Sequence, residues 1–161
     1  MTQKLPVIIG LGEILWDVYP KGKQLGGAPL NFSHHCAQLG ASAHPVSAVG
    51  ADADGAEIRQ ILAAKNLPDL HVQTDPTHPT GRVNVTLQDG KPTYEILAEV
   101  AWDYIRFDQN LRDLASRADA VCFGSLAQRS PVSRATIQAF LEAMRPEALR
   151  IFDVNLRQSF Y

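Results

Sequence analysis

The sequence predicts an α/β domain in which a mostly parallel sheet lies between two layers of helices. Short apolar runs typical of buried strands alternate along the chain with longer amphipathic segments typical of helices. Parallel strands that are joined through helices have both faces covered, which fits runs that are apolar without alternation. One hairpin interrupts this pattern because it carries polar residues along a whole face, and we expect it to lie outside the central sheet.

The expected strands are short and are followed by turn signals. Residues 7–11 form an apolar run that Gly12 closes. The next segment alternates, with Ile14 and Trp16 on one face and Asp17 on the other. Since the carboxyl ends of parallel strands meet at one edge of a sheet, polar residues after these strands are candidates for a shared site. Further strands are expected at 45–49, 120–123 and 149–154.

Four helices are expected between the strands. Pro29 suits the first turn of a helix that ends at Gly40, with Phe32, Cys36 and Leu39 as its inward stripe. The remaining helices are expected at 56–65 with Asp54 as a helix cap, at 108–115, and at 131–144 with Ser130 as its cap. The polar hairpin covers residues 82–97, with Asp89-Gly90 as its turn.

Composition and charge exclude several classes of protein. The 161 residues carry 15 Lys and Arg against 17 Asp and Glu, a net charge of −2, which argues against a nucleic-acid partner. No apolar run approaches about 18 residues and the first residues do not resemble a secretion signal, so we expect no membrane partner and a cytoplasmic location. Cys36 and Cys122 lack the spacing of a metal site, and both are expected to be reduced.

Glycines and polar residues near the start of the chain point to a small polar ligand. Gly26 and Gly27 allow a backbone to approach a ligand closely, and Asn31 can donate and accept hydrogen bonds toward the same space. A glycine turn before a helix with a solvated Asn explains these three residues equally well. Asp17 favours the ligand, because a carboxylate on a strand can accept hydrogen bonds from two adjacent hydroxyls of a polyol.

Gly10 and Gly12 permit another interpretation, the start of a dinucleotide-binding loop in a nicotinamide-dependent oxidoreductase. No third glycine follows at the required spacing, and the chain continues as a strand where that loop would open a helix. The oxidoreductase is therefore the weaker hypothesis.

Several segments together resemble the amino-terminal half of a PfkB-type sugar kinase. They are Gly-Glu-Ile-Leu-Trp-Asp at 12–17, Gly-Gly-Ala-Pro-Leu-Asn-Phe-Ser at 26–33, Leu-Gly-Ala at 39–41, Val-Gly-Ala-Asp at 49–52 and Asp-Val-Asn-Leu-Arg at 153–157. The first and last make the fructokinase branch the most similar, with the ribokinase and 2-keto-3-deoxygluconate kinase branches as neighbours. The resemblance implies a ribokinase-like three-layer α/β/α fold with a small β lid, incomplete in this chain.

The resemblance also implies roles for individual residues. Asp17, Gly26, Gly27 and Asn31 would hold sugar hydroxyls, and Tyr94 would form a wall of the sugar site. The lid would comprise residues 13–18 and 82–97.

Two residues near the end of the chain would act on the phosphates. The resemblance places Asn155 near the phosphates of ATP, which such kinases use together with Mg2+. It places Arg157 near the sugar or the transferring phosphoryl group, where a guanidinium stabilises spread negative charge. A strand-end cap followed by a surface arginine is the alternative interpretation of this pair.

The second signature of that family, Asp-x-x-Gly-Ala-Gly-Asp, does not occur in these 161 residues. Its final Asp is the family's general base, and its glycines form an anion hole. We therefore expect residues 1–161 to be one partial domain, the sugar-binding half of a kinase that phosphorylates fructose at its 6-hydroxyl, and to be inactive alone. The alternative is a noncatalytic module that binds a sugar or pairs with another subunit. A homodimer through the lid is also expected.

Overall fold

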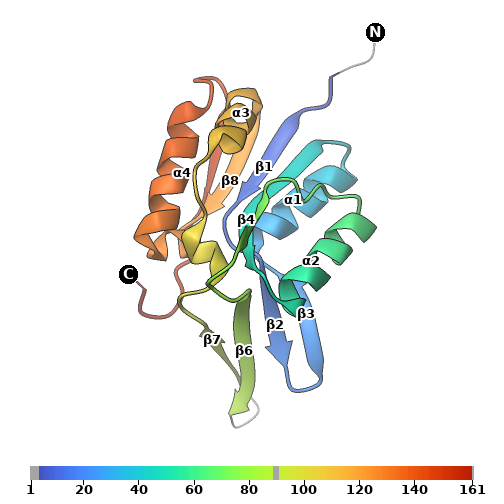
Figure 1. Ribbon diagram of the computed structural model, residues 1–161, viewed down its shortest axis with the longest axis vertical. Helices are drawn as coiled ribbons and strands as arrows, with labels where there is room; N and C mark the ends of the chain where they lie inside the picture. Colours follow the sequence, from blue (N-terminus) through green and yellow to red (C-terminus); the bar gives the residue numbers. More distant parts are fainter. Residues whose placement is uncertain (1–3, 89–90, 161) are drawn as a thin grey trace.

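Five parallel strands form the central sheet of this structure, a computed structural model that describes residues 4–88 and 91–160. The strand order is β5-β4-β1-β8-β9, and every neighbouring pair is parallel (Figure 1). The predicted turn at Asp89-Gly90 lies outside the described residues. The strands are β1 (Val7–Leu11), β4 (Ser42–Gly50), β5 (Val72–Asp75), β8 (Ala120–Gly124) and β9 (Leu149–Asp153).

Helices cover both faces of this sheet. Successive residues of a strand point to opposite faces, and the apolar residues on each face pack against helices. On one face, Ala43 and Val49 of β4 share a core with Leu30 and Leu62 of the first two helices. On the other face, Val46 and neighbouring residues pack against the last two helices. The result is a three-layer α/β/α arrangement (Figure 1). The helices are α1 (Ala28–Gln38) and α2 (Ala53–Ala64) on the first face, and α3 (Gln109–Arg117) and α4 (Pro131–Ala143) on the second.

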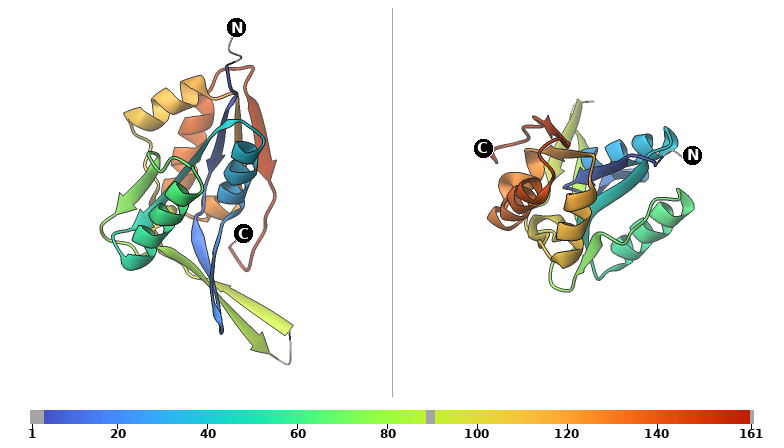
Figure 2. Two further views of the ribbon diagram at one scale, coloured as in Figure 1. Left: turned by 90° about the vertical axis from the view of Figure 1, so that its right-hand side faces the viewer. Right: turned by 90° about the horizontal axis from the view of Figure 1, so that it is seen from above.

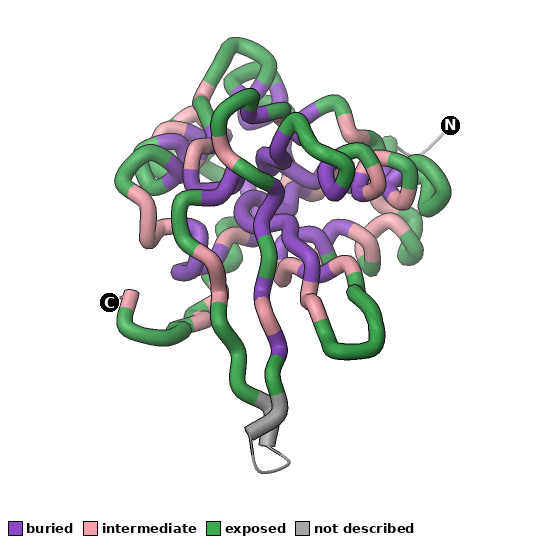
Figure 3. Tube along the Cα trace, turned by 60° about the horizontal axis from the view of Figure 1, so that its bottom comes forward, coloured by how far each residue is buried: buried purple, intermediate pink, exposed green. Residues whose placement is uncertain are grey.

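Four other strands form a second sheet that projects from one end of the central sheet (Figure 2). Its order is β3-β2-β6-β7, with β2 and β6 parallel and the two outer pairs antiparallel. Strands β6 and β7 extend away from the body (Figure 3), and Thr86, Thr93, Tyr94 and Glu95 on them are exposed. The strands are β2 (Leu15–Tyr19), β3 (Gly22–Gly26), β6 (Gly81–Gln88) and β7 (Lys91–Ile96).

Two short 3-10 helices precede the helices of the second face, one between β7 and α3 and the other between β8 and α4. They are joined by a buried ion pair, in which the Arg129 guanidinium donates to both carboxylate oxygens of Asp103 at 2.8 Å. The guanidinium also lies 4.0 Å from the ring centre of Trp102, which is fully buried. These helices are η1 (Ala101–Tyr104) and η2 (Leu126–Arg129).

The predicted inward stripe of α1 is right only for Cys36, which is partly buried and packs against the core. Leu39 is 88 % exposed and Phe32 is only partly buried, whereas Leu30 and Ser33 are buried. Gly10 of β1 explains the difference, because a Cβ there would overlap Ser33 Oγ and the neighbouring helix backbone. The helix therefore contacts the sheet closely along the side of its first turns.

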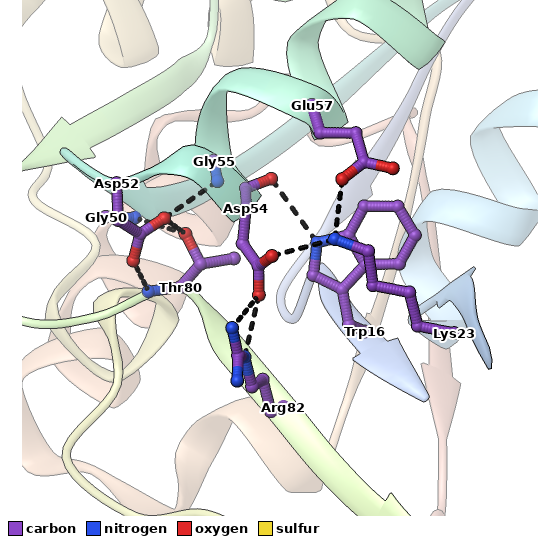
Figure 4. Close-up of polar contacts among 9 residues, drawn as sticks. All are labelled: Trp16, Lys23, Gly50, Asp52, Asp54, Gly55, Glu57, Thr80 and Arg82. Atoms are coloured by element: carbon purple, nitrogen blue, oxygen red, sulfur yellow. Dashed lines mark hydrogen bonds and ion pairs between the residues drawn. The ribbon is translucent and has the colours of Figure 1, made fainter. Parts of the chain in front are cut away.

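The predicted cap of α2 is also wrong. The helix begins at Ala53, and Asp52 is its N-cap, accepting a hydrogen bond from the Gly55 N–H at 2.8 Å. Asp54 lies within the first turn, and its carboxylate is directed toward the second sheet (Figure 4). Two strands, β3 and β5, were not expected, because their sequences are short and polar.

Candidate functional site

A cavity of about 380 Å³ lies where the carboxyl end of the central sheet meets the second sheet. It is lined by residues of the second sheet, by the start of α1, and by residues that follow strands β1, β8 and β9 of the central sheet. Six of the seven residues that the sequence singles out line this cavity, namely Asp17, Gly27, Asn31, Tyr94, Asn155 and Arg157. The other residues that line it are Glu13, Leu15, Tyr19, Ala28, Val83, Ile96 and Leu126.

Asp17 faces the cavity because β2 separates its two faces as the sequence pattern predicts. Trp16 packs with the core of the central domain, while Leu15 packs with Val83 on the cavity side. Burial raises the pKa of the half-buried Asp17 carboxyl above its ordinary value. A carboxylate in this position is short of solvent and presents acceptor oxygens to a ligand with hydroxyl groups.

Gly26 is the exception among the predicted site residues, since it does not line the cavity. It pairs with Leu15 across β2 and β3, and it is buried. A Cβ on Gly26 would lie 2.5 Å from Oδ2 of Asp17. Gly26 thus makes room for the Asp17 carboxylate.

Gly27 turns the chain from β3 into α1. Its φ of 114° lies in the region that favours glycine, and a Cβ there would overlap the carbonyl oxygen of Glu13. The Asn31 N–H donates to the Gly27 carbonyl at 3.0 Å, which starts the helix. This turn brings the Asn31 side chain to the cavity one turn into α1.

The segment after β9 brings Asn155 and Arg157 to the same cavity. The Asn155 N–H donates to Ser125 Oγ at 2.9 Å, and Arg157 Nε donates to Asn155 Oδ1 at 2.6 Å. Gln158 Nε2 donates to the carbonyl of Tyr94 on β7 at 3.0 Å. The segment is therefore tied both to the central sheet and to the second sheet, and its cationic group lies beside a polar cavity.

A polar network around α2 fixes the second sheet in place (Figure 4). Asp54 Oδ1 lies 2.8 Å from Lys23 Nζ of β3, and Asp54 Oδ2 lies 2.6 Å from an Arg82 nitrogen of β6. Trp16 Nε1 donates to the Asp54 carbonyl at 3.3 Å. One residue of α2 thus contacts three strands of the second sheet, β2, β3 and β6.

Asp52 anchors the chain that leads into β6. It accepts hydrogen bonds from the Thr80 N–H at 2.8 Å and from Thr80 Oγ1 at 2.6 Å (Figure 4). Burial alone would raise the pKa of Asp52, but the bonds from Thr80 and Gly55 outweigh it and lower that pKa. Asp52 is therefore an ionised carboxylate that is well hydrogen-bonded.

Sequence reasoning gave no role to Glu13, although it lines the cavity and is only 1 % exposed. Burial raises the pKa of its carboxyl to about 7, and Asp153 contributes in the same direction, while the backbone N–H groups of Glu13 and Ala28 oppose it. The sequence signal for Glu13 is an acidic residue directly after a buried strand.

The structure does not support a dinucleotide-binding loop at Gly10 and Gly12, because the strand β2 follows Gly12 where that loop would open a helix.

Within residues 4–88 and 91–160, no helix combines the length and apolar character needed to cross a bilayer. The same residues contain no group of three or more His, Cys, Asp or Glu side chains arranged to hold a metal ion. Both cysteines are free thiols, as expected.

The architecture and the cavity define a class of protein, because a three-layer α/β/α domain with a small second sheet at its carboxyl edge is shared with solved sugar kinases. An uncharacterized sugar kinase of Pyrococcus horikoshii superposes with a TM-score of 0.85 at 28 % identity, covering 96 % of this chain and 54 % of that one. A fructokinase of Xylella fastidiosa with bound ATP gives a TM-score of 0.83 at 22 % identity, covering 96 % of this chain and 50 % of that one. The ribokinase-like fold is thereby confirmed.

The sequence comparisons identify the family. The model of the pfkB family carbohydrate kinases matches residues 21–161. The Pyrococcus horikoshii sugar kinase is 30 % identical over 143 residues, which are 89 % of this chain and 46 % of that protein. The chain belongs to the pfkB family of carbohydrate kinases, and it spans about half the length of the relatives it matches.

Proposed function

We propose that this chain is the sugar-binding half of an ATP-dependent carbohydrate kinase, with the 6-hydroxyl of fructose as the leading acceptor. The observation that carries the proposal is the convergence of Asp17, Asn31, Asn155 and Arg157 on one cavity from three separate segments. A carboxylate and a carboxamide suit the hydroxyls of a polyol, and a guanidinium suits phosphate oxygens.

Each of these groups then has a distinct task. Asp17 accepts hydrogen bonds from two adjacent hydroxyls, and Asn31 fixes a third polar contact, so that the reacting hydroxyl is held in one orientation. Arg157, held by its bond to Asn155, stabilises negative charge on the group being transferred. The second sheet covers the cavity and reduces the access of water.

ATP supplies the phosphoryl group in such a reaction, and Mg2+ neutralises charge on its phosphates. Asn155 and Arg157 fit one side of a phosphate group, since both present hydrogen-bond donors at the cavity. The 161 residues contain no segment with the family's general base, and we expect them to bind sugar without turnover.

Fructose is proposed as the substrate on two grounds. The Asp-Val-Asn-Leu-Arg segment at 153–157 resembles the fructokinase branch. Fructokinases of Xylella fastidiosa and Vibrio cholerae are among the proteins with the same fold, and one Vibrio cholerae structure contains fructose, ADP and potassium.

Thermal unfolding of the chain with and without fructose, ribose, 2-keto-3-deoxygluconate and ATP tests the proposal. A sugar at about 100 times its dissociation constant stabilises the folded state by roughly 2.7 kcal/mol, which is readily measured. We expect fructose to raise the melting temperature, Asn31→Ala to abolish that rise, and Gln38→Ala, an exposed position on the same helix, to retain it. If no sugar raises the melting temperature of the unmodified chain, the proposal fails.

A second candidate, a module that pairs with another subunit, is favoured by the edge of the central sheet. Strand β9 has β8 on one side, and Phe152 is 51 % exposed, with Leu149, Ile151 and Val154 also exposed. Apolar edge strands of this kind favour pairing. Sedimentation at several concentrations tests it. Association that Phe152→Lys weakens would support pairing through β9, association that it leaves unchanged would point to the second sheet, and a monomer at all concentrations would exclude both.

A further inference from the structure

Ser125 forms hydrogen bonds with the chain that brings Asn155 and Arg157 to the cavity. It directly follows β8, is 5 % exposed, and precedes Leu126, which lines the cavity. The Ser125 N–H donates to the Asp153 carbonyl at 3.0 Å, and Ser125 Oγ accepts from the Asn155 N–H at 2.9 Å. The backbone and the side chain of one buried serine thus join the end of β8 to the chain at the end of β9.

The segment after β9 forms few other hydrogen bonds with the rest of the domain. Leu156 is 63 % exposed and contributes little to packing. Within residues 4–88 and 91–160, one further hydrogen bond joins residues 154–160 to another element, from Gln158 Nε2 to the Tyr94 carbonyl of the second sheet. The hydrogen bond from this segment to the central domain is therefore the one that Ser125 Oγ accepts.

The orientation of the Arg157 guanidinium depends on the same contacts. Arg157 Nε donates to Asn155 Oδ1 at 2.6 Å, and the backbone of Asn155 is held in turn by Ser125. A guanidinium forms its strong paired hydrogen bonds with a phosphate only when its nitrogens are correctly oriented. A shift of the Asn155 backbone would therefore displace the cationic group at the cavity.

We propose that Ser125 is a positioning residue for phosphate binding, whose hydroxyl fixes Asn155 so that Arg157 can contact the phosphoryl group on the 6-oxygen of the sugar. This inference rests on the proposed function, in which Arg157 contacts the transferred group. Ser125 does not itself line the cavity, so it acts through Asn155 and Arg157. Asp17 and Asn31, which are proposed to hold the sugar hydroxyls, come from other segments. Loss of the Ser125 hydroxyl should therefore impair phosphate binding and spare sugar binding.

The test compares the affinities of the 161-residue chain for fructose and for fructose 6-phosphate, the product of the proposed reaction. The phosphate is mostly a dianion above pH 7 and can form charge-assisted hydrogen bonds with Arg157. We expect the unmodified chain to bind fructose 6-phosphate at least about tenfold more tightly than fructose. In Ser125→Ala this affinity ratio should fall to below about threefold, while the affinity for fructose stays the same.

The possible outcomes separate this proposal from the proposed function. An affinity ratio in Ser125→Ala equal to that of the unmodified chain would overturn the proposal, even if the melting temperature fell, because a merely structural serine changes stability and not the ratio. Equal affinities of the unmodified chain for the two ligands would also overturn it, since there would be no phosphate contact to position. No binding of either ligand by the unmodified chain would remove the proposed function itself.

Three controls accompany the test. Arg157→Gln should lower the affinity ratio as Ser125→Ala does. Ser116→Ala should leave the ratio unchanged, because the Ser116 hydroxyl is exposed and donates to the Asp113 carbonyl within α3. Ser125→Thr and Ser125→Val, which have nearly equal volumes, cover the case in which Ser125→Ala does not fold. Only the threonine retains the hydroxyl, so it should keep the ratio that the valine loses, and equal ratios in these two variants would overturn the proposal.

Discussion

The carboxylate of Asp17 lies directly over the Cα of Gly26 on the adjacent strand, where a Cβ atom would be only 2.5 Å from Oδ2. Gly26 does not line the cavity, so it affects the cavity only through the position of Asp17. The lack of a side chain on Gly26 leaves room for a carboxylate that faces the cavity.

Gly26→Ala should therefore weaken sugar binding by displacing Asp17. We expect an affinity at least about tenfold lower, because one charged hydrogen-bonding group would leave its place. Calorimetric titration with fructose measures this change. Gly124→Ala is the matched control, since a Cβ there meets its nearest atom at 3.5 Å, and it should bind normally. Unchanged affinity in Gly26→Ala would mean that Asp17 does not hold the sugar.

Much of the fold was predictable because parallel strands leave a strong apolar signal. The strands at β1, β8 and β9 agree with the predicted ranges to within a residue or two. Strand β3, with the sequence Gly-Lys-Gln-Leu-Gly, was missed because its pairing with β2 and not its own residues makes it a strand.

The candidate site was predicted only in part. Asp17 and Asn31 are recognisable because they flank a Gly-Gly turn, and the structure brings them together with Asn155 and Arg157. Glu13 was missed because the raised pKa of its carboxyl results from burial, which a single sequence does not reveal. The roles of Lys23 and Arg82 depend on contacts with Asp54 across more than 25 residues of sequence, which no local pattern predicts.

Asp54→Asn should loosen the second sheet from α2. The change removes the charge that Lys23 and Arg82 share, and we expect the melting temperature to fall by roughly 2–8 °C. Hydrogen exchange should become faster in β3 and β6 than in the central sheet. Glu57→Gln is the control, because Glu57 contacts Lys23 at a more exposed position, and it should have a smaller effect. Equal exchange rates in the two variants would count against an anchoring role for Asp54.

Stability should fall with rising pH through the titration of Glu13. Its pKa is raised from 4.5 to about 7 in the folded chain, so the folded state holds its proton more tightly than the unfolded state. The resulting stabilisation is complete below pH 4.5 and is lost as the pH rises to about 7, with a total of about 3 kcal/mol. Urea unfolding of the unmodified chain and Glu13→Gln between pH 4.5 and 8 measures it. The difference between them should change over this range, and a constant difference would contradict the prediction.

The buried pair of Arg129 and Asp103 should be costly to break. Both side chains are 5 % exposed, so Arg129→Met leaves a buried carboxylate without its partner, and we expect a loss of about 3–5 kcal/mol in urea unfolding. Replacing both residues, as Arg129→Met with Asp103→Leu, should recover part of that loss. Arg145→Met breaks the exposed pair with Asp119 and should cost under about 1 kcal/mol. If Arg129→Met and Arg145→Met lost similar free energy of unfolding, burial would not decide how much each ion pair contributes to stability.

Hydrogen exchange with and without saturating fructose tests most directly whether this cavity binds the sugar. We predict slower exchange on fructose addition in three segments that line the cavity, at residues 13–19, 27–31 and 155–157. Protection confined to segments that do not line the cavity, such as α2 and α3, or no protection at a fructose concentration that raises the melting temperature, would contradict the account.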